Sequence, residues 1–253
     1  MADLSVCIEM VFADLPIEER IERAAAAGAD AIEFWGWRDK DLNAIADACA
    51  AADVDIAAML GSDAPLTDPT GTDAAVHDLE RSIEVATEIG CSNLIVTVGQ
   101  EQGDVDREAQ HDSIVEALSR VAPIAEDAGI ALGVEPLNTA VDHPGYYLTS
   151  TAEGREIVRE VDSTAVGLLF DVYHQQITEG DVTRSLTNAI GDLTYVHVAD
   201  NPGRNEPGTG ELNYDTILSA LVEAGYDGYV GCEFSPISDD SKAVERCREL
   251  LAG

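Results

Sequence analysis

The stretch VGLLFDVYHQQ (residues 166–176), followed after a helix-like spacer by TYVHVADNPGRNEPGTGELNY (residues 194–214), decides the fold of this chain. Each half opens with an apolar run that leads into side chains able to hold a metal ion or move a proton. Asp171 and His174 follow the first run, and His197 lies inside the second. The pattern predicts two buried strands whose carboxyl ends carry the chemistry of the protein.

Eight strand signals of this kind recur along the chain, each followed by an amphipathic segment. Most are continuous apolar runs without strict alternation, which is typical of parallel strands buried on both faces. Many helical segments begin after Asp, Ser or Thr and end at Gly. The strands are expected to start near Leu4, Ala31, Asp55, Asn93, Ile130, Val166, Thr194 and Tyr229. The helices are expected over residues 17–27, 39–51, 73–89, 106–128, 152–161, 181–190, 214–224 and 239–251.

The alternation of strands and helices predicts the fold class. The spacing between strand starts fits one strand–helix unit each time, so we expect a single domain over residues 1–253. Eight such units predict an α/β fold, a (β/α)8 TIM barrel with an eight-stranded parallel barrel and outer helices. The alternative is an open doubly wound sheet. That fold usually has a glycine-rich phosphate loop after its first strand, and residues 9–12 (EMVF) do not form one.

The charge of the chain is strongly acidic. Its 253 residues contain 49 Asp and Glu against 14 Lys and Arg, a formal net charge of -35. The acids are spread evenly, which indicates a solvated acidic surface and not an interaction tail. We expect a halophilic organism, because salt at 1 M screens charges beyond about 3 Å and so removes their self-repulsion. Such a surface should repel nucleic acid and anionic lipid.

Cysteine usage and the N-terminus bear on the compartment. The five cysteines are scattered without a CxxC pair, so we expect small buried thiols and no disulfide framework. The opening MADLSVCIEM lacks a basic segment, and no apolar run reaches the roughly 18 residues of a membrane span. A soluble cytoplasmic protein without membrane association is the expectation.

Four predicted strands end in a potential metal ligand. Glu135 lies in IALGVEPLN (130–138), where it ends the apolar run, Asp171 follows LLF, His197 lies in TYVHVAD and Glu233 follows GC in YVGCEF. The carboxyl ends of parallel barrel strands meet at one face, so these side chains could converge. Each acid alone fits a salt bridge or a helix cap equally well. The chain has few cations to pair all of them, whereas one divalent ion satisfies them together.

The composition of this set indicates which metal it would take. Three carboxylates and one imidazole form a hard, mostly oxygen site, which favours Mn2+ or Mg2+, with Co2+ as a further candidate. Zinc usually selects more His or Cys. The ion would polarise a carbonyl and hold two neighbouring oxygens. Two of the carboxylates would flank the substrate, one taking a proton from carbon and the other returning it.

Two further residues are candidates for substrate binding. His174 is expected beside the metal, where a strand end turns into a loop, without being a ligand itself; a core or capping histidine is the alternative. Arg204 lies in the Gly- and Pro-rich loop and suits an anionic or oxygen-rich substrate group. The alternative for Arg204 is an ion pair with Glu206.

The remaining candidates would shape the site. Trp35 and Trp37, in FWGW, are expected either to wall the pocket with apolar surface or to pack their own loop. Asn138 and Glu211 are expected to support the groups that touch the metal or the substrate.

Several segments resemble one enzyme family. VEPLN (134–138), FDVYHQQ (170–176), HVADNPGRNEPGTGELNY (197–214) and GYDGYVGCEF (225–234) are similar to the hydroxypyruvate isomerase group. That group lies within the xylose isomerase-like superfamily of sugar isomerases and epimerases. The pattern PGR-x-EPGTGE-x-NY within residues 202–214 is the most specific part, and the similarity covers nearly the whole chain.

The resemblance implies a barrel with one divalent metal on Glu135, Asp171, His197 and Glu233. It further implies that Glu135 and Glu233 correspond to the family's paired acid and base. The reaction implied is aldose–ketose isomerisation of a short hydroxy-oxo acid or sugar, of the hydroxypyruvate/tartronate semialdehyde type, through a cis-enediolate.

Three positions relate the chain to the ketose epimerases of the same superfamily. His174 and Arg204 match positions that contact the substrate there. His197, in YVHVA, stands where the hydroxypyruvate isomerases carry Gln and where the ketose 3-epimerases carry His. The resemblance therefore leaves a ketose 3-epimerase as an alternative.

The same residues bear on three other functions that this barrel can support. A metal-dependent lyase of the inosose dehydratase type would use the same enolate and then expel a hydroxyl group. A phosphodiester hydrolase resembling endonuclease IV needs extra His ligands and a basic groove, whereas this chain has five His and is acidic. A non-catalytic binding barrel would show a broken carboxylate set. The expected partners are a small oxo acid or sugar and further copies of the chain, as a dimer or tetramer.

Overall fold

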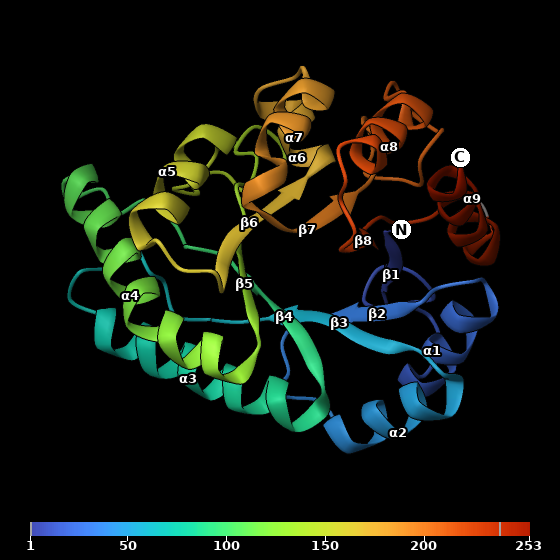
Figure 1. Cartoon of the computed structure of the whole chain (residues 1–253), viewed down its shortest axis with the longest axis horizontal. Coiled ribbons are helices and arrows are strands. Elements are labelled where there is room, and N and C mark those ends of the chain that lie inside the picture. The colour runs from blue at the N-terminus through green and yellow to red at the C-terminus, as the bar shows by residue number, and fades with distance from the viewer. Residues whose placement is uncertain (1, 238) are drawn as a thin grey trace.

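The fold is an eight-stranded parallel barrel, seen in a computed structural model that describes residues 2–237 and 239–253. The strands follow one another around the closed barrel in chain order, and the helices form an outer ring (Figure 1). The strands are β1 (Asp3–Cys7), β2 (Ala31–Phe34), β3 (Asp55–Leu60), β4 (Cys91–Val96), β5 (Ala131–Val134), β6 (Val166–Asp171), β7 (Leu193–Val198) and β8 (Tyr229–Cys232).

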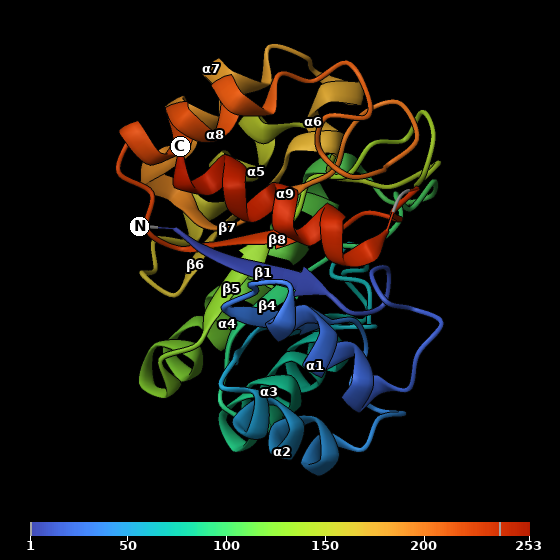
Figure 2. The same ribbon diagram turned by 90° about the vertical axis from the view of Figure 1, so that its right-hand side faces the viewer.

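The outer ring is made of one or more helices after each strand. They are α1 (Ile17–Ala26), α2 (Leu42–Ala52), α3 (Thr72–Ile89), α4 (Arg107–Ala128), α5 (Thr151–Val161), α6 (Val172–Thr178), α7 (Val182–Ala189), the 3-10 turn η1 (Ile190–Asp192), α8 (Tyr214–Glu223) and α9 (Asp240–Ala252). Helix α9 closes the ring by packing against α8 on one side and α1 on the other (Figure 2). The (β/α)8 barrel predicted from the sequence is therefore confirmed.

One element differs from the sequence prediction. A loop was expected after Asp171, whereas the chain continues directly into α6. The cause is the side chain of Asp171, which caps the helix by accepting a hydrogen bond from the backbone N–H of His174 at 3.0 Å. The same aspartate thus ends a strand and begins a helix, which fixes where His174 lies.

The apolar core has two layers. The larger layer lies between the strands and the outer helices. The smaller one fills the barrel interior with Ala31, Ala58, Ile95, Leu169 and Tyr195. Alanine side chains in this layer are small, which leaves room in the barrel for the fully buried ring of Tyr195.

The strand register shows which residues face inward at the carboxyl end of the barrel. His197 of β7 pairs with Asp171 of β6 on one side and with Gly231 of β8 on the other. Successive side chains of a strand alternate in direction, so Gly231 and Glu233 face the same way. The polar residues at these strand ends therefore point toward one another above the apolar interior.

The cysteines are buried and free, as the sequence predicted; they are Cys7, Cys49, Cys91, Cys232 and Cys247. None of the helices formed by the described residues is both long enough and apolar enough to cross a membrane.

Candidate metal centre and active site

Four side chains from neighbouring strands converge at the carboxyl end of the barrel. Glu135 follows β5, Asp171 ends β6, His197 lies in β7 and Glu233 follows β8. All four are buried, and one potential ligand atom from each lies within 4.8 Å of the others. The structure thus brings together the complete set that the sequence singled out.

This set is suited to a divalent cation. His197 Nδ1 lies 3.5 Å from Glu135 Oε1 and 3.4 Å from Glu233 Oε2. Among the described residues, neither His197 Nδ1 nor Asp171 Oδ2 has a hydrogen-bonding partner. Buried polar atoms left in this way are costly, and a hard cation would satisfy them together. The residues therefore fit the Mn2+ or Mg2+ centre that the family resemblance implies.

The two glutamates have very different proton affinities in the protein. Burial raises the pKa of Glu135 to about 7, because the positive charge of His197 offsets burial only in part. Burial acts in the same direction on Glu233, but the charges of His197 and Arg204 prevail and lower its pKa to about 2. A pair of carboxyl groups separated in this way is typical of acid–base sites.

Arg204 closes one side of the centre. Its guanidinium group hydrogen-bonds the Glu233 carboxylate, and Nη2 lies 3.7 Å from Asp171 Oδ2. The backbone of Arg204 is left-handed, with φ at 54°, and its carbonyl accepts a hydrogen bond from the N–H of Ser235. This hydrogen bond ties the loop between β7 and α8 to the segment after β8. It thereby holds the guanidinium group of Arg204 against the carboxylates of Glu233 and Asp171.

His174 lies on the other side, fully buried in the first turn of α6. Its Nδ1 is 2.7 Å from Asn138 Nδ2, and because an amide nitrogen can only donate, Nδ1 accepts this bond. The ring proton is then on Nε2, which lies 3.6 Å from Asp171 Oδ2. Burial lowers the pKa of His174, which favours the neutral ring.

Asn138 supports this histidine from behind. It is fully buried, its Nδ2 also donates to Asp142 Oδ2, and its Oδ1 accepts from the N–H of Val141. With both ends of its amide in use, Asn138 orients His174 and fixes the loop that follows β5.

A small cavity of about 230 Å³ opens over the centre. Its apolar walls and polar floor are formed by Trp35, Leu60, Ile95, Thr97, Glu135, Leu137, His143, His174, Arg204 and Glu233. Trp35 stands at the mouth, 44% exposed, with its Nε1 donating to Glu233 Oε1 at 3.3 Å. This volume suits a short substrate, since sites for larger ligands usually exceed about 300 Å³.

Trp37, which the sequence also offered as a pocket wall, is turned away from the cavity. Its Nε1 donates to Ser82 Oγ of α3 at 3.0 Å, and the guanidinium of Arg38 lies 4.5 Å from the ring centre. The packing alternative holds for this tryptophan, because its indole bonds to α3 and packs against Arg38 instead of lining the cavity.

One charged residue of the site was missed by the sequence reasoning. Glu33 of β2 is 1% exposed, and its Oε1 lies 3.0 Å from His197 Nε2. The signal that could have found it is an acid inside the apolar run AIEFW (31–35). The sequence does not say that closure of the barrel brings side chains of β2 and β7 into contact.

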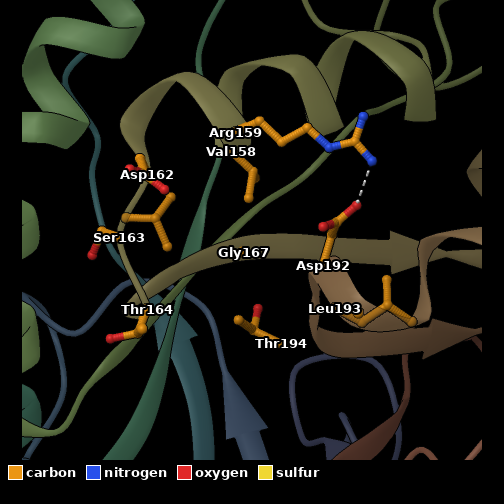
Figure 3. Close-up of a pocket in the computed structure, with 11 residues that line it drawn as sticks. Val158, Arg159, Asp162, Ser163, Thr164, Gly167, Asp192, Leu193 and Thr194 are labelled. Carbon is orange, nitrogen blue, oxygen red and sulfur yellow. Dashed lines mark hydrogen bonds and ion pairs between the residues drawn. The ribbon is translucent and has the colours of Figure 1, made fainter.

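A larger hollow of about 590 Å³ lies at the opposite end of the barrel, around the beginnings of β6 and β7 (Figure 3). The arginine that lines it is paired with an acid of the hollow: Asp192 Oδ2 is 3.4 Å from Arg159 Nη2, and also 2.5 Å from Nε of the nearby Arg155. Enzymes with this fold carry their active sites at the carboxyl ends of the strands. The smaller cavity over the carboxylates is therefore the candidate active site.

Fold and site together define a (β/α)8 barrel with a carboxylate–imidazole centre at the carboxyl ends of its strands. Residues 21–251 match the family model described as xylose isomerase-like TIM barrel, and the chain belongs to this family.

Curated relatives cover nearly the whole chain. It is 31% identical to the 2-oxo-tetronate isomerase of Cupriavidus necator over 254 residues, 94% of each protein. It is 30% identical to the hydroxypyruvate isomerase of Escherichia coli over 253 residues, 93% of this chain and 94% of that one. Both relatives carry isomerase names.

Solved structures share the fold. A protein from Brucella melitensis described as an AP endonuclease of family 2 superposes with a TM-score of 0.91 at 29% identity, covering 98% of this chain and 99% of that one. A D-allulose 3-epimerase from a Methylomonas species superposes with a TM-score of 0.85 at 22% identity, covering 99% and 97%.

Proposed function

We propose that the protein is a metal-dependent isomerase of short hydroxy-oxo acids, which moves a carbonyl group between two neighbouring carbons through a cis-enediolate. The observation that carries the proposal is the convergence of Glu135 and Glu233, with opposite pKa shifts, on one buried centre beneath a small cavity. The names of the relatives above support the substrate class, because hydroxypyruvate and 2-oxo-tetronate are both short oxo acids.

Glu135, Asp171, His197 and Glu233 would hold one divalent ion, Mn2+ or Mg2+, with Co2+ as a further candidate. When bound, the ion would polarise the substrate carbonyl and bind the oxygen on the adjacent carbon. The hard, carboxylate-rich donor set supports these metals over zinc.

The two glutamates would move the proton. One carboxylate removes the proton from the carbon beside the carbonyl, which leaves a cis-enediolate with its electron pair shared over both carbons. Return of a proton to the former carbonyl carbon, together with passage of the hydroxyl proton to the former carbonyl oxygen, completes the exchange of carbonyl and hydroxyl positions. Both carboxylates line the small cavity above the centre, which supports this division of labour.

Neighbouring side chains would orient the substrate. Arg204 offers a cationic group suited to the carboxylate or hydroxyl oxygens of an oxo acid, and its buried Nε has no partner among the described residues. His174 Nε2 is likewise buried without a partner there. Trp35 would cover the apolar side, and Asn138 would contribute by orienting His174.

A ketose 3-epimerase is the second candidate, and the residue that favours it is His197. The isomerase group carries Gln at this position and the ketose 3-epimerases carry His. An epimerase would remove and return a proton at one carbon without moving the carbonyl group.

The deciding experiment follows solvent deuterium into the substrate by NMR. The Mn2+-loaded protein in deuterated buffer is offered hydroxypyruvate, tartronate semialdehyde, 2-oxo-tetronates and ketoses from tetruloses to hexuloses. We expect deuterium beside the carbonyl of a short oxo acid, together with the isomeric product. Exchange should stop in Glu135→Gln, in Glu233→Gln and on chelation, and should persist in Glu18→Gln on the exposed face of α1.

Other outcomes contradict the proposal in distinct ways. Exchange at one ketose carbon with inverted configuration would indicate the epimerase. Loss of water from the substrate would indicate a lyase of the inosose dehydratase type. A metal-loaded protein that exchanges no proton in any compound would remove the isomerase for these substrates.

A further inference from the structure

We propose that Glu33 is a positioning residue that holds the His197 ring in the tautomer and orientation required for metal binding. The inference rests on the proposed metal centre and concerns a residue outside its ligand set. Glu33 belongs to β2, whereas the four ligands come from β5 to β8, so the contact crosses the barrel interior.

The geometry divides the two ring nitrogens of His197 between two tasks. Nε2 lies 3.0 Å from Glu33 Oε1, whereas Nδ1 faces Glu135 Oε1 and Glu233 Oε2. Metal binding requires the charged His197 ring to lose one proton; with the carboxylate of Glu33 holding the proton on Nε2, the ligating lone pair is on Nδ1. That lone pair then points at the place where the other three ligands converge.

Few groups in the described part of the chain, other than His197, are placed to stabilise the charge of the Glu33 carboxylate. It is 1% exposed, and a buried carboxylate without a partner is strongly unfavourable. Among residues 2–237 and 239–253, the only cationic partner within ion-pair distance is His197, and Glu33 Oε1 has no competing hydrogen bond. The other oxygen, Oε2, accepts a hydrogen bond from Tyr195 OH at 2.5 Å. Tyr195 therefore fixes the carboxylate so that its free oxygen faces the histidine.

The barrel also leaves room for this arrangement at Gly231 of β8. A Cβ atom there would lie 2.6 Å from Glu33 Oε2, 2.8 Å from His197 Cδ2 and 3.0 Å from Tyr195 Cε1. All three side chains thus pack against a position where only glycine fits without displacement. Strands β2, β7 and β8 together build the contact.

A carboxylate on the distal nitrogen makes a metal-ligating histidine a better ligand. It fixes the tautomer, holds the plane of the ring and increases the electron density on the ligating nitrogen, and its removal typically weakens metal affinity by about 10- to 100-fold. Glu33 is placed for this role. It does not line the cavity, and among the described residues it forms an ion pair with His197 but no hydrogen bond with the three carboxylate ligands.

The test measures Mn2+ affinity by isothermal titration calorimetry in the full chain, without substrate. Relative to the wild type, Glu33→Gln should weaken the affinity about 10-fold or more, and Glu33→Asp, which keeps the charge, should recover part of the loss. The control Tyr195→Phe removes the hydroxyl group but leaves the carboxylate beside His197, so its loss should be smaller than that of Glu33→Gln.

A double-variant cycle separates positioning from a general packing effect. Glutamine has no ring tautomer, so in a His197→Gln background the Glu33→Gln change should cost far less affinity than in the wild type. In the Mg2+-loaded protein, histidine 15N chemical shifts should place the His197 proton on Nε2 in the wild type and shift in Glu33→Gln. Thermal melting of the metal-free proteins confirms that each variant is folded.

The outcomes distinguish the two proposals. A wild type that binds no Mn2+ would overturn the proposed metal centre, and this inference with it. A wild type that binds Mn2+, beside Glu33→Gln and Glu33→Asp variants with unchanged affinity, would overturn the positioning role alone. An equal loss in the His197 and His197→Gln backgrounds would also overturn it.

Discussion

Glu135 and Glu233 are chemically identical side chains that their surroundings make different. Both are buried, yet Glu233 lies against Arg204 and Glu135 has no guanidinium group in contact among the described residues. The result is one carboxyl group with a raised pKa and one with a lowered pKa on the same centre. At the scale of single residues, chemistry is set by which cation each acid meets.

Asn138 is a second single residue whose contacts matter, because its amide orients His174 and fixes the loop after β5. Replacing Asn138 by Ala leaves these buried partners unsatisfied, so we expect a loss of about 1–3 kcal/mol in the free energy of unfolding, measured in denaturant. We also expect a higher KM, because the His174 ring and the loop lose their support.

The matched control for this prediction is Asn93→Ala. Asn93 is also a buried asparagine, and its Nδ2 donates to the Ala57 carbonyl at 2.8 Å within the barrel wall. This variant should lose similar stability with an unchanged KM. If Asn138→Ala binds substrate as the wild type does, Asn138 has no role beyond packing.

At the scale of elements, each strand of the second half of the barrel carries one ligand at its carboxyl end. The parallel register of β5 to β8 sets these ends side by side, and the alternation of side chains turns them inward. A bound ion would therefore connect four neighbouring strands that are otherwise joined by backbone hydrogen bonds. Metal binding and barrel stability are expected to be coupled.

This coupling predicts a shift in thermal stability. A ligand present at 100 times its Kd stabilises the native state by about 2.7 kcal/mol, so saturating Mn2+ should raise Tm relative to the chelated protein. Asp171→Asn, which weakens one ligand, should lose most of the Mn2+-dependent rise. A Tm that is equal with Mn2+ and with chelator would contradict the metal centre.

Gly231 gives a second prediction at this scale. In Gly231→Ala the new methyl group would overlap Glu33 and His197, and overpacking of this kind costs about 1–3 kcal/mol. We expect a lower free energy of unfolding together with weaker Mn2+ binding. The control is Gly191→Ala, where an added Cβ meets nothing within 4 Å and neither quantity should fall. Unchanged metal affinity in Gly231→Ala would show that the Glu33–His197 contact tolerates displacement.

At the scale of the whole molecule, charge dominates. The chain carries a formal net charge of -35, and most of its acids lie on the surface, while Glu135, Asp171 and Glu233 of the centre are buried. Self-repulsion of such a surface opposes the compact state, and salt weakens it. Stability should therefore depend on ionic strength far more than it does for a neutral protein of this size.

We accordingly expect Tm to rise by several degrees when KCl is increased from about 0.1 M to about 2 M, because screening shortens from about 10 Å to less than 3 Å. Differential scanning fluorimetry across the salt series measures this. Sucrose at matched osmolality is the control, since it strengthens burial without screening charge. A Tm that follows sucrose and KCl equally would assign the effect to exclusion from the surface.

The sequence by itself determined the barrel and the four members of the centre. Each signal is local: an apolar run gives a strand, a glycine ends a helix, and a carboxylate or imidazole at a strand end has its position fixed by the run before it. Glu135, Asp171, His197 and Glu233 could be found because parallel strands bring equivalent ends to one face, whatever the details of packing.

Only the tertiary structure decided how the surrounding residues are used. That Glu33 meets His197 follows from closure of the ring, which brings inward-facing side chains of β2 and β7 together although β1 and β8 lie between the two strands, a relation that no local pattern contains. The sequence allows Trp37 either to line the pocket or to pack on α3, and it allows a loop after Asp171. Contacts that form only in the folded chain decide both cases. The periodicity and composition of the sequence predict which residues are buried. Which groups a buried charge contacts depends on how the strands are arranged once the barrel closes.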